Sequence, residues 1–80
     1  MSKNEEARLY ADIGINYCIQ NDTSLYLPLL LGRKSIALFH IKDPTWNTYM
    51  RQAITLLEIQ NRMELKGHYE KELERYEKLV

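Results

Sequence analysis

The basic segment 33–42 is the part of this sequence best suited to bind a charged ligand. A glycine precedes it, but position 27 is leucine where a phosphate-binding loop of the GxxxxGK[ST] type needs glycine, and Arg33 stands between glycine and lysine. A second hypothesis remains, in which Ser35 caps a helix whose free amides bind a phosphate or carboxylate. This small-anion or nucleotide site would use Arg33, Lys34, Ser35 and Lys42. The alternative is a basic loop that faces water.

Nucleophilic and metal chemistry find little support in the remaining polar residues. Cys18 is the single cysteine, and its neighbours on a helix include no histidine, so a buried structural thiol is the better interpretation. His40 lies in an apolar run and His68 follows a glycine, without a carboxylate cluster beside either. We therefore expect no enzyme activity, no metal site and no cofactor.

The charge balance narrows the classes of partner. Eleven basic and eleven acidic residues give a formal net charge of zero, which argues against a general nucleic-acid binder. Basic residues outnumber acidic ones only in residues 23–57, an asymmetry that either orients a partner or second subunit or simply faces solvent. The N-terminus MSKNEEARLY is too charged for a signal peptide, and no run reaches the roughly 18 apolar residues of a membrane span. We expect a cytoplasmic protein that does not associate with a membrane.

The spacing of apolar residues predicts an all-α fold, a small bundle of helical hairpins with four to five helices in a single domain over residues 1–80. The expected helices cover residues 4–20, 25–31, 36–42, 45–66 and 69–79. Gly32 is expected to end the second helix, and Asp43-Pro44 to begin the long helix from about residue 44. The first helix is apolar over most of its girth, which predicts a central position or one sandwiched at an oligomer interface.

The apolar stripe of the last 36 residues changes sides near Gly67. On one unbroken helix, the stripe that follows Gly67 would point about 150° away from the stripe that begins at Trp46. One straight helix cannot bury both stripes against one core. Either the chain turns at Gly67-His68, or the C-terminal segment packs on a different partner.

Two segments resemble parts of a tetratricopeptide repeat. Residues 67–79 resemble its second helix, with a turn glycine followed by aromatics at Tyr69 and Tyr76, although Glu72 stands where the family has alanine. Residues 9–17 resemble the first helix of a repeat. The resemblance implies helical hairpins and the binding of a peptide or protein in a groove, without catalysis.

We therefore expect a non-catalytic protein- or peptide-binding module that acts as an adaptor, chaperone or regulator. A chain of this length hides at most ~60% of its unfolded surface, so a second copy would add useful burial, and we predict a homo-oligomer, in its simplest form a homodimer. The predicted contact residues are Trp46, Tyr49, Tyr69, Leu73 and Tyr76. Tyrosine and tryptophan are favoured both at core edges and at interfaces, and the sequence leaves these two alternatives open.

Overall fold

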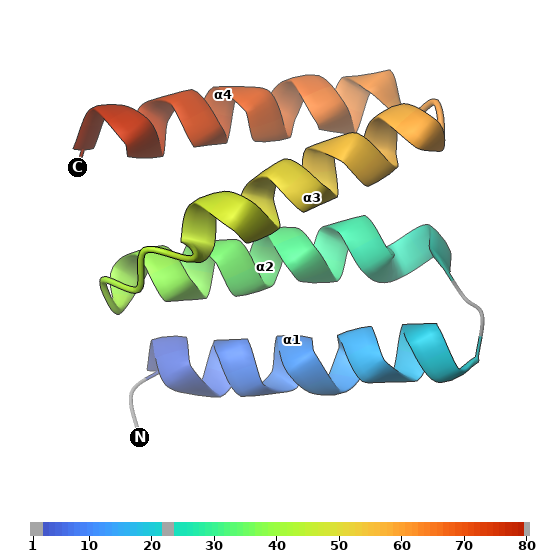
Figure 1. Cartoon of the computed structure of the whole chain (residues 1–80), viewed down its shortest axis with the longest axis horizontal. Coiled ribbons are helices and arrows are strands. Elements are labelled where there is room, and N and C mark those ends of the chain that lie inside the picture. The colour runs from blue at the N-terminus through green and yellow to red at the C-terminus, as the bar shows by residue number, and fades with distance from the viewer. Residues whose placement is uncertain (1–2, 22–23, 80) are drawn as a thin grey trace.

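The computed structural model describes residues 3–21 and 24–79, and this part of the chain is helical throughout, apart from short connections (Figure 1). The elements are α1 (Lys3–Gln20), a short 3-10 turn η1 (Ser24–Tyr26), α2 (Leu27–His40), α3 (Trp46–Ile59) and α4 (Met63–Leu79). The predicted all-α bundle is therefore confirmed, with four α-helices in the described residues.

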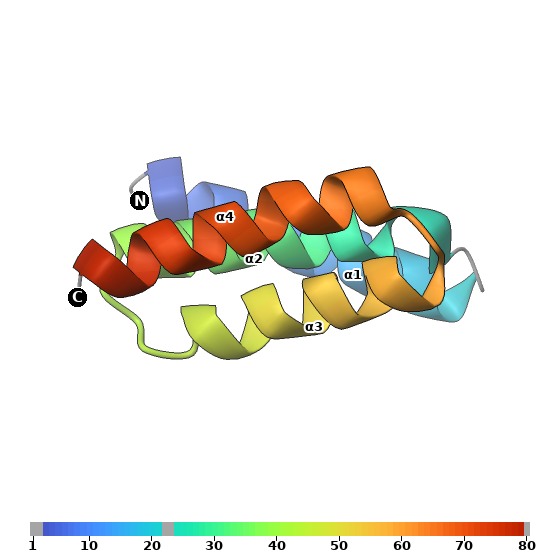
Figure 2. The ribbon, with the colours of Figure 1, turned by 90° about the horizontal axis from the view of Figure 1, so that it is seen from above.

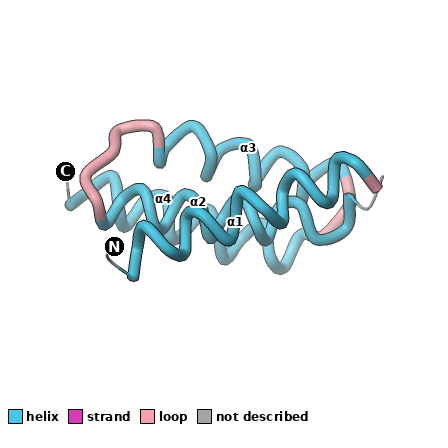
Figure 3. The backbone as a smooth tube through the Cα atoms, turned by 90° about the horizontal axis from the view of Figure 1, so that it is seen from below, coloured by secondary structure: helices cyan, strands magenta, loops and turns pink. Residues whose placement is uncertain are grey.

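Successive helices pack against one another in chain order. The closest neighbours are α1 with α2, α2 with α3, and α3 with α4. The molecule is thin in one direction, with extents of 32 × 28 × 15 Å. Seen from above and from below, α4 lies on the same side of α3 as α2 does (Figures 2 and 3). The turns that join α2 to α3 and α3 to α4 lie at opposite ends of the bundle. Three helices thus share one core, and α1 packs outside it against α2.

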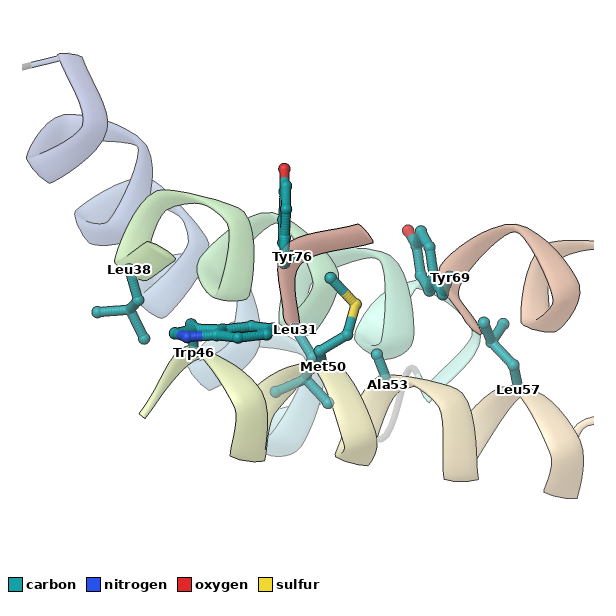
Figure 4. Packing of buried hydrophobic residues seen from close by; sticks show 8 residues of the cluster. All are labelled: Leu31, Leu38, Trp46, Met50, Ala53, Leu57, Tyr69 and Tyr76. Atoms are coloured by element: carbon teal, nitrogen blue, oxygen red, sulfur yellow. The ribbon is translucent and has the colours of Figure 1, made fainter. Parts of the chain in front are cut away.

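The core is built from one face each of α2, α3 and α4 (Figure 4). Met50, Ala53 and Leu57 follow the helical spacing along α3 and are fully buried. At one end of the core, aromatic rings join all three helices. The ring of Phe39 stacks on Tyr76 with centroids 4.1 Å apart, and Trp46 meets Tyr76 edge-on at 5.8 Å. Such aromatic pairs contribute about 0.5–1.5 kcal/mol beyond the burial of their area.

Helix α2 is continuous where the sequence predicted two helices, over 25–31 and 36–42. Gly32 does not end a helix and has no left-handed φ. Ser35, expected as a helix cap, is fully buried in the middle of α2, and its hydroxyl donates a hydrogen bond to the backbone carbonyl of Trp46. The prediction was wrong because glycine tolerates a helix interior where a neighbouring side chain needs the space of its missing Cβ.

The predicted long helix over 45–66 is in fact two helices. It breaks at residues 60–62, where Asn61 has a left-handed φ of 58° and the Arg62 amide donates to the Leu57 carbonyl at 2.8 Å. Gly67 lies inside α4. The change of sides in the apolar stripe was a real signal, but the chain turns at residues 60–62, five to seven residues before Gly67. Because α4 folds back, Trp46 and Tyr76 reach the same core, and the second stripe needs no separate partner.

Helix α1 lies at the outside of the bundle, so the prediction of a central helix was wrong. Its buried side chains, Ala11 and Cys18, lie on the side of α1 that packs against α2, and a Cβ added at Gly14 would lie 3.0 Å from Leu30. The burial of Cys18 matches the expected structural thiol. The other alternative, a helix sandwiched at an oligomer interface, stays a prediction, because much of α1 is exposed.

The connection from α2 to α3 is fixed by Asp43. Its Oδ1 accepts hydrogen bonds from the Thr45 amide at 2.9 Å and the Thr45 hydroxyl at 2.6 Å, and α3 begins at Trp46 rather than at the expected Pro44. The two hydrogen bonds, that of the hydroxyl first, lower the pKa of Asp43. Asp43 therefore holds the turn before α3 and is not the N-cap that the sequence predicted, because the N-cap position is Thr45, which makes no side-chain capping bond.

Candidate functional site

An open groove of about 970 Å³ lies between α1 and α3 above α2. It exists because α1 and α3 pack on opposite sides of α2 (Figure 1) and do not pack closely against each other. Its apolar lining comes from all three helices: Ile15, Ile19, Leu27, Leu31, Tyr49 and Leu56. Its polar lining is Asp12, Asn16, Lys34, Thr48, Arg51, Gln52 and Thr55.

Lys34 connects the three helices that form the groove. Its Nζ lies 2.6 Å from Asp12 Oδ1 on α1 and 4.2 Å from the centre of the Tyr49 ring on α3. Burial by itself lowers the pKa of Lys34 and is the largest single influence, but Asp12 and Tyr49 together outweigh it, and the pKa is raised. The ammonium therefore stays charged and holds α1 and α3 at a fixed spacing on α2.

The second cation of the groove is also engaged. Arg51 Nε donates to Asn47 Oδ1 at 2.7 Å, and its Nη2 lies 3.3 Å from Glu77 Oε1 on α4. Since both Lys34 and Arg51 have carboxylate partners, the charges of the groove are largely balanced. The rest of the groove is apolar, with short polar side chains along the α3 side.

Three of the five predicted contact residues belong to the core. Trp46 is 6% exposed and Tyr76 4% exposed, and Tyr69 is buried in the same core cluster. All three are buried between α2, α3 and α4 because α4 folds back onto the other two helices, so they do not form the predicted partner surface in this structure. Leu73 is half-buried against the same core. Leu73 also lines a small hollow on α4, and Tyr49 is the one of the five that lines the groove.

The residues of the predicted anion site do not come together. Lys34 lines the groove, Arg33 lines a smaller hollow between α1 and α2 beside Tyr10, and Lys42 lines another at the end of the bundle near Asp43. Ser35 is buried, and no helix begins there to offer free amides. The anion-binding hypothesis was built on a helix start at Ser35 that the continuous α2 removes.

Sequence reasoning missed the apolar residues of the groove. A signal for them was present, because Ile15 and Ile19 lie on a side of the first helix different from that of Ala11 and Cys18, so this helix has more than one apolar face. The sequence indicated that the first helix makes several contacts. It did not indicate that the first helix faces α3 across a groove, because that arrangement depends on how α3 packs on α2.

The described residues contain no group of three or more histidine, cysteine, aspartate or glutamate side chains placed to bind a metal ion. Within the same part of the chain, no helix combines the length and the apolar character needed to cross a membrane. The fold defines the protein's class as a small all-α bundle with an apolar groove. Comparison with protein-family models, with curated proteins and with solved structures finds no match to this chain.

Proposed function

We propose that this protein is a non-catalytic binding module that holds an amphipathic helix of a protein or peptide partner in the groove between α1 and α3. The observation that carries this proposal is the apolar lining that three helices leave open along one side of the bundle. A helix with its side chains is roughly 10 Å across and presents apolar residues at positions i, i+3, i+4 and i+7 to such a groove.

The chemistry of the groove favours an apolar face over a charged one. Lys34 and Arg51 are paired with Asp12 and Glu77, so neither needs a charge from the partner. Ile19 is 66% exposed at the edge of the groove, where it would gain burial from a bound helix. A module of this kind acts as an adaptor, chaperone or regulator, since binding changes the location or state of the partner and not its covalent structure.

The test is selection of binders from a library of displayed peptides, followed by NMR mapping of a selected peptide on the protein. We expect amphipathic helical peptides that shift the resonances of Ile15, Ile19 and Tyr49. The variant Ile19→Glu should weaken binding about tenfold or more, which corresponds to roughly 1.4 kcal/mol. The matched control is Ile59→Glu, because Ile59 is also exposed but does not line the groove.

The proposal fails if the selected peptides bind as extended segments or map outside the groove. It also fails if Ile19→Glu and Ile59→Glu bind the selected peptide as tightly as the unmodified protein does. Both substitutions lie at exposed positions, so the helical circular dichroism of each variant should be unchanged.

A further inference from the structure

The exposed apolar surface of this protein is concentrated at its first helix. Among the described residues, ten large apolar side chains are exposed, and five of them lie on α1. They are Leu9, Tyr10, Ile13, Tyr17 and Ile19. Ile19 lines the groove, whereas the other four are not accounted for by the groove. A monomer rarely leaves a contiguous apolar patch of this kind without a use for it.

Three of these residues form a seam with the spacing of a coiled coil. Tyr10, Ile13 and Tyr17 are three and four residues apart, are 70%, 58% and 62% exposed, and continue to Glu6 and Gln20 at the same spacing. At 100° per residue, the seam points roughly 120° away from the side of α1 that packs on α2. It points roughly 170° away from Ile15 and Ile19, so the seam and the groove are separate surfaces.

We propose that this seam is the interface between two copies of the chain, in which α1 packs against α1 of the partner subunit in antiparallel orientation. The charges of the seam decide the orientation. Lys3 and Glu6 both lie in its first half, and residues 13–21 carry no charge. A parallel pair would oppose Glu6 to Glu6 and Lys3 to Lys3, which is unfavourable.

The antiparallel pair removes this repulsion and offers each polar group a neighbour. In the register that places Tyr10 beside the partner subunit's Ile13, Glu6 meets the partner subunit's Tyr17, and Lys3 meets the partner subunit's Gln20. A tyrosine hydroxyl donates a hydrogen bond to a carboxylate at such a site. The seam is its own complement under a two-fold axis, as an isologous dimer interface requires.

The available area fits a modest dimer. At about 200 Å² for each large side chain, Leu9, Tyr10, Ile13 and Tyr17 expose roughly 450 Å² in each subunit. Specific interfaces begin at about 600 Å² per subunit, and the polar side chains beside the seam supply the remainder. The dimer should therefore form and dissociate with concentration, and it leaves the groove open in both subunits.

Sedimentation velocity over a range from micromolar to millimolar protein tests this dimer. We expect the unmodified chain to move from monomer to dimer, Ile13→Glu to remain monomeric, and Ile59→Glu to dimerise as the unmodified chain does. The groove variant Ile19→Glu should also dimerise, which separates failure of this interface from failure of the proposed function. All three substituted positions are exposed, so circular dichroism should show the same helix content in each variant.

Cross-linking tests the orientation. In a Cys18→Ala background, Ile13→Cys should be joined to its counterpart by a short bis-maleimide, because the two positions lie near the two-fold axis. Glu6→Cys should not be joined, because the two copies of position 6 are about 16 Å apart along the helix axis. In sedimentation velocity, a protein that is monomeric at every concentration overturns the inference, and so does a dimer that survives Ile13→Glu or is lost equally in Ile59→Glu. In cross-linking, a yield through Glu6→Cys equal to that through Ile13→Cys overturns it.

Discussion

The ring of Tyr69 on α4 lies directly over Gly32 on α2. A Cβ atom added at Gly32 would come within 2.9 Å of Tyr69 Cζ and 3.0 Å of its hydroxyl oxygen. Tyr69 is buried there, and this burial raises the pKa of its phenol. The contact explains why a glycine stands in the middle of a helix, where alanine would be favoured by propensity alone. It lets α4 approach α2 closely enough to close the core.

Gly32→Ala should therefore destabilise the fold. The added methyl group overlaps the ring of Tyr69, and overpacking of this kind typically costs about 1–3 kcal/mol, which exceeds the ~1 kcal/mol that alanine gains over glycine in a helix. We expect a net loss of about 1 kcal/mol in the free energy of unfolding. Urea unfolding followed by circular dichroism measures it, and a variant as stable as the unmodified protein would contradict the role assigned to this contact.

Gly67→Ala should have the opposite effect. Gly67 lies inside α4 with ordinary helical φ, and a Cβ placed there would meet nothing within 4 Å. The substitution adds helix propensity and restricts the unfolded chain, so the free energy of unfolding should rise by about 0.5–1 kcal/mol. The same urea experiment compares the two variants, and a loss of stability in Gly67→Ala would show that residue 67 is not in a regular helix.

These two glycines show where prediction from the sequence reached its limit. Periodicity correctly gave an all-α bundle and the first helix. The reversal of the apolar stripe gave a turn between Trp46 and Tyr76 as one of two alternatives, although it placed that turn at Gly67-His68. Propensity, however, gives Gly32 and Gly67 the same weight as helix breakers. Only the contact of Gly32 with Tyr69 distinguishes them, and that contact joins residues far apart in the sequence. The true turn contains Asn61, a residue that tolerates the left-handed φ it adopts.

The candidate site was harder to predict than the fold. Tyr49 was expected to meet a partner and does line the groove. Trp46 and Tyr76 are aromatic residues of the same kind, yet they lie in the core. Aromatic residues with a polar end suit both environments, so residue type alone does not separate them. The groove depends on α1 and α3 sharing α2 as a neighbour, a relation that local spacing does not contain.

Stability should fall at alkaline pH because of Lys34 and Tyr69. Both have raised pKa values in the folded protein, above ordinary values of 10.5 and 10.0. The folded state thus holds these protons more tightly than the unfolded state, so their contribution is complete below the ordinary pKa values and is lost as the pH rises through the folded ones. Thermal unfolding at a series of pH values should show melting temperatures that decline above about pH 10.

The variants Lys34→Met and Tyr69→Phe separate the two groups. Each keeps most of the side chain's volume and removes one titrating group, so each should flatten part of the alkaline decline. Lys34→Met should also loosen α1, because Asp12 loses its partner on α2. Unchanged alkaline profiles in both variants would mean that other groups control the decline.

Lys42→Gly should stabilise the protein. Lys42 adopts a left-handed φ of 63° in the connection between α2 and α3, a conformation that costs a residue with a side chain roughly 1–2 kcal/mol. Glycine adopts it without strain, although its greater freedom in the unfolded chain offsets part of the gain, so we expect a net increase of about 0.5–1 kcal/mol. Lys42→Ala is the matched control, since it removes the charge and the side chain while keeping the backbone strain. It should leave the urea midpoint nearly unchanged, and an equal shift in both variants would assign the effect to the lysine side chain instead of the backbone.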